Sequence, residues 1–590
     1  MSFHNIHKYE SERKMKVKFV NKKSIILCIE CLLIIVCAVF SFDKINFPTV
    51  INDEFGYLGN AAYFAGYNWK SILSNVPYYS YGYSLLLTPL FILFNNGVNI
   101  YYGVYAINIL SLMGSFLLIN YILKEIFSDI SWTLRSVISF IATINVYTFI
   151  MAGYAMAENV LFFSICLTFA FFIYFIKGPS ILKGIILGSI ISFSHLLHQR
   201  SLALVVAMLI MIVFLGIVKK TRKSVLIAVV ISIVIGLVMQ TEVKEILKNA
   251  IWNSDNVANG NDYAGVLGVI WELKSLDGIV NFIFSLISKV FAVTVSYFFM
   301  PLFFVEVCLK RLYELIKNKF VEINNKDILY IALFVTLICA TGISALFALY
   351  PTRKDSVIYT RYIEYMLGPI MAIALCELTK IKFKKLRVFN YFIIMLLCCP
   401  IVNKALSWVL NDEFIEIASP VLATFYKENK LYIYISLLVM ILIFVVIYSV
   451  FSSKKMWMKN TVIILIIVLS VLRGINIKTQ WTDFDDIKRQ TYQIGKQIEN
   501  VIATENVEYE IAIVRGGIDY YTMHYYGGFI QQYLPKVKME YIDKDEINSI
   551  CTDARKLIVS DESTALNTEL IDCEELYSND RLCIFKSKGD

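Results

Sequence analysis

The sequence predicts a mainly α-helical, polytopic membrane protein that ends in a small α/β domain. Of its 590 residues, 58% are hydrophobic and only 17% are charged, and the mean hydropathy is +0.63. A soluble protein carries roughly 25% charged residues. Long apolar runs recur from residue 24 to residue 477, and from about Thr479 the sequence becomes polar and mixed. This composition excludes a water-soluble enzyme, a disordered chain and a fibrous repeat.

The apolar runs predict about thirteen transmembrane helices. A helix needs about 20 apolar residues to cross ~30 Å of hydrocarbon, and fewer where neighbouring helices shield its ends. Runs of this kind lie at 24–42, 100–122, 136–150, 159–176, 181–198, 201–218, 224–240, 282–308, 328–349, 363–379, 388–402, 431–452 and 460–477.

The stretch 82–94 is too short to cross, and charge decides where it lies. A helix of this length reaches only about 20 Å, and tyrosines crowd its start, as is typical of a membrane interface. If the stretch lies on the outer surface, the cytoplasmic segments hold 28 Lys and Arg in 71 residues, against 12 in 154 outside. This asymmetry fits the positive-inside rule, so we expect a cytoplasmic N-terminus and an extracytoplasmic C-terminal domain. The net charge of +8 is then mostly a signal of sidedness rather than of an acidic partner.

The polar C-terminal segment predicts a separate domain. We expect a transmembrane domain over residues 1–478, whose first outer loop spans 43–99 and contains interfacial helices, and a soluble α/β domain over 479–590. In the second domain the apolar and helical patterns predict strands and helices. The strands lie at 509–514, 556–559 and 581–586, and the helices at 484–503 and 518–533.

Two adjacent carboxylates, Asp53 and Glu54, lie at the expected outer interface shortly after the first span. Desolvation there raises the pKa of a carboxyl group, and a like-charged neighbour raises one of the two further. Such a group suits general-base work near neutral pH. The alternative is a solvated or helix-capping pair, which is common at the end of a span. The next residues place Tyr57, Ala61 and Phe64 on one helical face, which indicates an interfacial helix.

The segment from residue 53 to residue 90 resembles the first-loop signature of the GT-C glycosyltransferases. The matching residues are Asp53-Glu54, Tyr57-Leu58 with Ala61, Gly66, Tyr81-Gly82-Tyr83 and Pro89-Leu90. The segment looks most like the protein O-mannosyltransferase and lipid A aminoarabinose transferase branch, whose enzymes take a sugar from a polyprenyl monophosphate on the outer face of the membrane. The resemblance implies that Asp53 is the catalytic base. The paired prolines usual before the second interfacial helix are reduced here to Pro77, which leaves the exact subfamily open.

A polyprenyl-phosphate donor requires cations, because charge grows on the phosphate as it leaves. The expected outer loops contain few, so each is a candidate phosphate ligand: Lys70, Arg200, Arg353, Lys354 and Arg361. Arg361-Tyr362, with Pro369 further on, resembles an Arg-Tyr pattern of this superfamily in which an arginine meets a lipid phosphate. An arginine that extends only to the lipid headgroups is the alternative.

Glu158 lies at the outer end of another expected span, 159–176. The resemblance implies a second acidic residue at this place, near the catalytic aspartate. Glu158 would orient the acceptor, pair with Arg361 or help to bind a cation. The alternative is an ordinary charge at a helix N-terminus, favoured by the helix dipole.

Four further residues are expected to support the site: Tyr57, His195, His198 and Tyr362. The two histidines share a short outer turn with Arg200. A histidine pair three residues apart could hold a metal ion, but no third ligand lies nearby in the sequence. Hydrogen bonding to phosphate or to a neighbouring helix is therefore the favoured interpretation.

The expected function is that of an inverting glycosyltransferase, which moves a sugar from a polyprenyl-phosphate donor to an acceptor hydroxyl at the outer face of a bacterial plasma membrane. The expected partners are the lipid donor, membrane lipid and an acceptor glycan, lipid or protein of the cell envelope, without nucleic acid. The sequence requires no cofactor and leaves a divalent cation open. A transporter or flippase of lipid-linked sugars is one alternative, although transporters place ionisable groups near the membrane midplane. A polysaccharide polymerase is another.

Overall fold

A computed structural model describes most of the chain. The described residues are 23–42, 51–73, 77–251, 266–321, 323–349, 357, 359–406, 431–453, 455–479, 483–515, 520–550, 555–561 and 573–587.

Helices make up most of the described residues. Within the described ranges, eight helices of at least 18 residues are apolar enough to cross a membrane, as expected of a multi-pass membrane protein. They are α5 (Gly97–Ile126), α8 (Glu158–Lys177), η1 with α10 (Gln199–Ser201, Leu202–Ile217), α11 (Lys223–Ile251), α14 (Leu276–Ser296), α16 (Asn325–Phe347), α19 (Lys385–Leu406) and α22 (Leu431–Phe451). Shorter apolar helices are α4 (Gly82–Leu93), α9 (Ile181–Leu197), α18 (Leu367–Leu378) and a stretch of α23 (Met456–Thr479). The expected count of about thirteen spans is not confirmed.

Three of the expected spans are each broken into two helices, and one of them, 363–379, is divided between α17 (Arg361–Glu364) and α18. The run 136–150 forms α6 (Trp132–Thr143) and α7 (Val146–Met151), and Asn145 starts α7 with a capping box to Thr148. The run 282–308 forms α14 and α15 (Met300–Lys317). Between them Phe298 and Phe299 adopt left-handed backbone angles, with φ of 52° and 61°. This conformation interrupts a right-handed helix.

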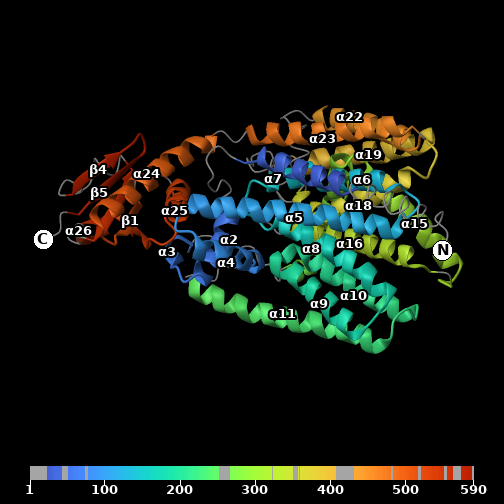
Figure 1. Cartoon of the computed structure of the whole chain (residues 1–590), viewed down its shortest axis with the longest axis horizontal. Helices are drawn as coiled ribbons and strands as arrows, with labels where there is room; N and C mark the ends of the chain where they lie inside the picture. The colour runs from blue at the N-terminus through green and yellow to red at the C-terminus, as the bar shows by residue number, and fades with distance from the viewer. Residues whose placement is uncertain are drawn as a thin grey trace, which may run out of the picture.

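The long helices form one bundle, and the C-terminal domain lies at one end of it (Figure 1). The helices α2 (Ile51–Phe64), α3 (Lys70–Leu73) and α4 of the first loop gather at this same end. With 12 residues, α4 reaches only about 18 Å. It packs on α2, where Ser84 donates its hydroxyl to the backbone oxygen of Tyr57 at 2.7 Å. The interfacial position of the stretch 82–94 stays a prediction.

The C-terminal domain contains a five-stranded sheet in the order β2-β1-β3-β5-β4. The strands are β1 (Glu510–Arg515), β2 (Met539–Asp543), β3 (Lys556–Asp561), β4 (Glu574–Ser578) and β5 (Leu582–Lys586). The pairs β1–β2 and β1–β3 are parallel, and β3–β5 and β5–β4 are antiparallel. The helices are α24 (Asp483–Glu505), α25 (Tyr520–Tyr533), η5 (Lys544–Glu546) and α26 (Ile547–Ile550). The boundary at 478/479 stays a prediction.

The two faces of this sheet pack into different cores. Ile511 and Ile513 on one face belong to the same continuous apolar core as the first loop and the membrane helices. Ala512 and Val514, which alternate with them, belong to a separate small core. Alternate side chains of a strand point to opposite faces. One face of the domain is thus continuous with the helical bundle.

Candidate active site

Asp53, in the first turn of α2, is held by side chains from two other parts of the chain. Tyr79 donates its hydroxyl to Oδ1, and Arg361 donates Nη2 to Oδ2 at 2.7 Å. The ring of Tyr79 lies directly over Gly56, where a Cβ atom would come within 2.0 Å of it. Asn60 Nδ2 also donates to the backbone oxygen of Tyr79 at 2.9 Å. The sequence that follows Asp53 therefore fixes the tyrosine that bonds to it.

Arg361 joins Asp53 to a second carboxylate. Its Nε and Nη2 lie 2.7 and 2.5 Å from Oε1 of Glu158. Arg200 Nη1 approaches the same oxygen at 3.2 Å. Two arginines and two carboxylates thus form one network. Glu158 is 0% exposed, and Arg361 and Arg200 are 8% and 9% exposed. Charges at this depth persist only when they are paired.

One oxygen of this network has no donor in the described part of the protein. Glu158 Oε2 is buried and accepts no hydrogen bond from any described residue. Buried polar atoms are nearly always hydrogen-bonded, so an orphan of this kind calls for a partner beyond the described residues, such as water or a bound molecule. It lies on the same carboxylate that receives both arginines.

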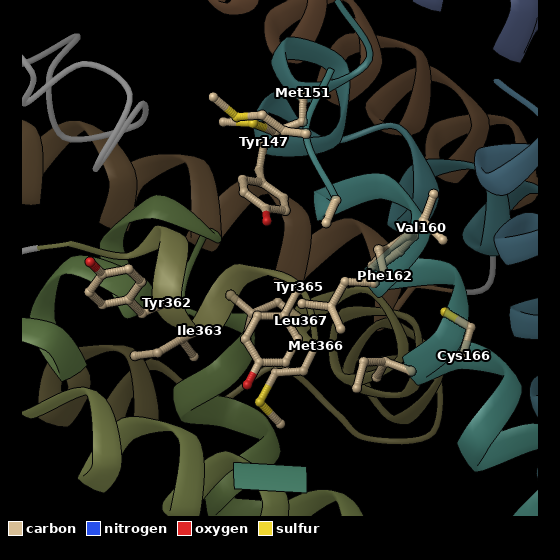
Figure 2. Close-up of a cluster of buried hydrophobic side chains, with 14 of the residues drawn as sticks. Tyr147, Met151, Val160, Phe162, Cys166, Tyr362, Ile363, Tyr365, Met366 and Leu367 are labelled. Atoms are coloured by element: carbon tan, nitrogen blue, oxygen red, sulfur yellow. The ribbon is translucent and has the colours of Figure 1, made fainter. Parts of the chain in front are cut away.

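Apolar packing positions the network. Figure 2 shows side chains of α7, α8 and the segment that follows Arg361 gathered into one buried cluster. The cluster brings α17 (Arg361–Glu364) and the start of α18 against α8, whose first residue is Glu158. Tyr365, in the same cluster, donates its hydroxyl to the backbone oxygen of Arg200 at 3.1 Å. Labelled members are Tyr147, Met151, Val160, Phe162, Cys166, Tyr362, Ile363, Tyr365, Met366 and Leu367.

The pKa of Asp53 is lowered, which is the opposite of the shift expected from the sequence. Burial by itself raises the pKa of this carboxyl group. The charge of Arg361, the hydrogen bond from Tyr79 and the charge of Arg200 together outweigh burial and hold the pKa below its usual 3.8. The carboxylate of Glu54 is adjacent in the sequence, whereas the arginines come from distant parts of the chain and are brought to Asp53 only by the fold. Asp53 is therefore ionised at neutral pH in this state.

Glu54 points away from Asp53 and into the protein. It is 0% exposed. Its Oε1 accepts hydrogen bonds from the hydroxyl of Tyr101 and from the backbone N–H of Ala155, the latter at 2.7 Å. Glu54 thus ties α2 to α5 and to the turn that precedes Glu158. These contacts favour a positioning role over direct catalysis.

This arrangement lies in a fold that has known counterparts. No protein-family model and no curated protein matches the sequence. Among solved structures, the chain is similar to ArnT, a GT-C lipid A aminoarabinose transferase, from Cupriavidus metallidurans bound to undecaprenyl phosphate. The identity is 12% and the TM-score is 0.50, over 95% of this chain and 97% of that one. The chain has the GT-C fold. The resemblance expected from the sequence is therefore confirmed for the fold.

Two further structures match over much of their length. Apo ArnT from the same organism has 12% identity and a TM-score of 0.49, over 97% of this chain and 98% of that one. The Archaeoglobus fulgidus oligosaccharyltransferase tethered with an acceptor peptide has 11% identity and a TM-score of 0.41, over 91% of this chain and 69% of that one.

Within this GT-C fold, two of the four supporting residues predicted from the sequence, His198 and Tyr362, contact Arg200. His198 Nδ1 accepts the backbone N–H of Arg200 at 3.2 Å. The guanidinium of Arg200 lies 4.4 Å from the centre of the Tyr362 ring. His195 lies in the last turn of α9, and its Nδ1 is buried without a hydrogen-bond partner among the described residues. Tyr57 is linked to Asp53 through Tyr79, because the centres of the Tyr57 and Tyr79 rings lie 5.4 Å apart.

Of the other predicted phosphate ligands, Lys70 is not joined to the network in the described residues, and two lie outside these residues. Lys70 begins α3, and no hydrogen bond or ion pair connects its ammonium to the Asp53 network in the described residues. Arg353 and Lys354 lie outside the described residues. The assignment of all three as phosphate ligands stays a prediction.

Sequence reasoning missed two residues of this region. Tyr79 was seen only as part of an interfacial tyrosine cluster. Lys289, in α14, is 0% exposed and lies 5.5 Å from the centre of the Tyr362 ring and 3.5 Å from the backbone oxygen of Tyr359. The signal was available, since a lysine inside an apolar run is a functional candidate by default.

The described residues contain no group of three or more His, Cys, Asp and Glu that could hold a metal ion. Within the network, arginines bond to Asp53 Oδ2 and Glu158 Oε1, and Tyr79 bonds to Asp53 Oδ1. A metal site is therefore not assigned.

Proposed function

We propose that this chain is a polyprenyl-phosphate-dependent glycosyltransferase of the GT-C type, acting at the outer face of the membrane. One observation carries the proposal: Arg361 joins Asp53 to Glu158 in a buried network at the junction of α2, α8 and α17. Such a network offers a carboxylate base beside cations that suit a phosphate leaving group. The fold shared with an undecaprenyl-phosphate-bound transferase supports the same donor class.

In the proposed reaction the acceptor hydroxyl attacks the anomeric carbon of the sugar directly. Asp53 removes the proton as the oxygen attacks, and the bond from the sugar to the phosphate oxygen breaks. Charge then grows on the departing polyprenyl phosphate, where Arg361 and Arg200 stabilise it. Attack from the face opposite the phosphate inverts the anomeric centre, and no covalent intermediate is needed.

The donor phosphate would also change the base. In the present arrangement Arg361 lowers the pKa of Asp53. A phosphate that draws the guanidinium toward itself weakens this ion pair, and burial then raises the pKa of the carboxyl group. Binding of the donor would thus make Asp53 a stronger base only when the leaving group is in place. Oε2 of Glu158, which accepts no hydrogen bond from the described residues, is free to receive a donor group of the acceptor or the sugar.

We assign roles to the other charged residues from where they lie relative to Asp53. Glu54 holds α2 through Tyr101 and Ala155. Lys289 adds a cation on the Tyr362 side of the site. Lys70, Arg353 and Lys354 remain proposed ligands of the donor phosphate. The sugar is unassigned, and the acceptor is a glycan, a lipid or a protein.

The decisive assay separates a transferase from a transporter. The purified protein is incubated with a polyprenyl-phosphate sugar that carries one radiolabel in the sugar and another in the lipid, together with bacterial envelope extract as the acceptor source. We expect the two labels to separate, with the lipid recovered as polyprenyl phosphate. In proteoliposomes, movement of the doubly labelled lipid between leaflets with both labels intact would instead identify a flippase.

A further inference from the structure

Helix α2 lies between the membrane helices and the C-terminal domain. Asp53 faces Arg361, at 2.7 Å. Phe55, two residues on and therefore about 200° around the helix, faces the domain. Its ring lies edge-on to that of Phe529 in α25, with 6.0 Å between the ring centres. Both phenylalanines are buried, at 1% and 0% exposure. The helix that carries the proposed base is thus held from both sides.

The contact between α2 and α25 has no spare room. A Cβ atom at Gly528 would lie 2.5 Å from the ring of Phe55, closer than real side-chain carbons approach. Gly528 is therefore needed for α25 to lie this close to α2. The neighbouring glycine, Gly527, faces the other way, and a Cβ there would meet the hydroxyl of Tyr541 at 2.2 Å, inside the domain.

Further contacts fix the domain to the rest of the first loop. Trp69 Nε1 donates to the backbone oxygen of Pro535 at 2.9 Å. The backbone N–H of Tyr541 donates to Ser71 Oγ at 3.2 Å. Tyr541 belongs to β2, the edge strand of the sheet, so α3 covers an edge that would otherwise expose unpaired backbone groups.

The domain also meets the start of α5. A Cβ atom at Gly97 would lie 1.8 Å from the backbone oxygen of Gln532. The same apolar core runs through both sides of this interface. An independently tethered module would have a polar and loosely packed interface instead.

We propose that the C-terminal domain is a positioning element of the active site. Through α25 it presses on Phe55 and sets the rotation of α2 that aims Asp53 at Arg361. The consequence for activity rests on the proposed role of Asp53, whereas the mechanical coupling does not. Because a misplacement of about 1 Å can reduce catalysis on the order of a hundredfold, a small shift at this interface matters for the rate.

The test uses the full-length protein and three variants. Gly528→Ala adds one methyl group against Phe55. Gly527→Ala is the matched control, since it adds the same methyl group one residue away, against Tyr541 within the domain. The double variant Gly528→Ala with Phe55→Leu restores space at the interface. Any effect of alanine on α25 itself is shared by the two single variants.

Amide hydrogen exchange gives a readout that needs no substrate. We expect Gly528→Ala to speed exchange in peptides of α2 by about tenfold or more, while β1 at the centre of the domain keeps its protection. Gly527→Ala should leave α2 protected, and the double variant should restore most of the protection. If α2 exchanges at the wild-type rate in Gly528→Ala while β1 stays protected, the proposal is wrong.

A fourth variant, Trp69→Phe, decides the case in which Gly528→Ala also exposes β1. Trp69→Phe removes the bond to Pro535 from the side of the first loop and leaves the domain unaltered. An α2-specific rise in exchange supports the proposal, and unchanged exchange in α2 overturns it.

Transfer kinetics then test the consequence. With a radiolabelled polyprenyl-phosphate sugar, Gly528→Ala should lower kcat by about tenfold to a hundredfold and leave the KM for the donor nearly unchanged. Equal activity of Gly528→Ala and Gly527→Ala would remove the catalytic part of the inference. A wild type that transfers no sugar would contradict the proposed function, while the exchange results would still decide the coupling.

Discussion

Tyr79 influences the pKa of Asp53 through a single contact. Its hydroxyl donates a hydrogen bond to the carboxylate, and its ring is held in place over Gly56. This hydrogen bond lowers the pKa of Asp53. In Tyr79→Phe the bond is lost, so the pKa rises. If Asp53 must be ionised to act, the acid limb of the kcat/KM profile then moves to higher pH, and the rate near neutral pH changes less than the rate in acid.

The matched control for this measurement is Tyr67→Phe. Tyr67 lies in the same loop and loses a comparable hydrogen bond, to the backbone oxygen of Phe91 at 3.0 Å, without any contact to Asp53. Its acid limb should coincide with that of the wild type. A Tyr79→Phe profile that also coincides with the wild type would show that the acid limb does not report on Asp53.

The same lowered pKa predicts a sign for stability. A carboxyl group whose pKa is depressed on folding contributes stability that is fully present above its unfolded value and is lost as the pH falls through the folded value. The stability that ionised Asp53 adds should therefore persist at every pH above 3.8 and disappear only in stronger acid. Thermal unfolding of wild type and Asp53→Asn in detergent, compared from neutral pH downward, measures this difference.

Glu158 is the common acceptor of two buried arginines, so its charge should matter for folding. In Glu158→Gln both arginines lose a charged partner at a site with 0% exposure. Breaking a buried ion pair from one side costs about 3 kcal/mol or more. Glu505→Gln is the control, because Glu505 pairs with Lys586 at a partly exposed site, where water screens the charges and the loss should lower the unfolding temperature much less. Equal unfolding temperatures for the two variants would show that the ion pairs of Glu158 do not stabilise the fold more than an exposed pair does.

At the scale of elements, apolar pattern predicted what is buried and missed what lies at an edge. The strands β1, β3 and β5 were predicted, and they are the three central strands of the sheet. The strands β2 and β4 were missed. Both are edge strands and carry charged residues, such as Glu540 in β2 and Glu574 and Glu575 in β4, which edges commonly use against aggregation.

The broken spans show a second limit of apolar pattern. Hydropathy is continuous through 136–150 and 282–308, so it predicts one helix in each. The breaks are set by local geometry: a capping box at Asn145, and two left-handed residues at Phe298 and Phe299. Side-chain caps and backbone angles of this kind hardly change the mean hydropathy of a window. Span number is therefore less predictable than membrane character.

For the whole molecule, the sequence predicted the four charged residues of the Asp53 network, but it predicted neither Lys289 nor any of the contacts between them. Asp53 and Arg361 are 308 positions apart and yet bond directly. Each was singled out by its place at an expected outer interface, which is a local property. Their pairing depends on the packing of α8 against the segment after Arg361, which no local pattern contains. The direction of the Asp53 pKa was predicted wrongly for the same reason.

Sidedness is a whole-molecule prediction that rests on the distribution of lysine and arginine. Lys319, in a basic segment after α15, should be cytoplasmic, and Asp580, in the C-terminal domain, should be outside. Both residues are exposed. We expect a membrane-impermeant maleimide to label Asp580→Cys in intact cells and to label Lys319→Cys only after the cells are opened. The reverse pattern would place the proposed site in the cytoplasm.

If Asp53 is the base of a sugar transfer from a polyprenyl phosphate, the transfer rate should depend on its carboxylate and not on that of a distant aspartate. Transfer from a radiolabelled polyprenyl-phosphate sugar is measured for wild type, Asp53→Asn and Asp129→Asn, an exposed aspartate paired with Lys380. We expect Asp53→Asn to lower kcat by about 10² to 10⁴-fold, the range of general-base catalysis. Asp129→Asn should match the wild type. Full activity in Asp53→Asn would contradict the account.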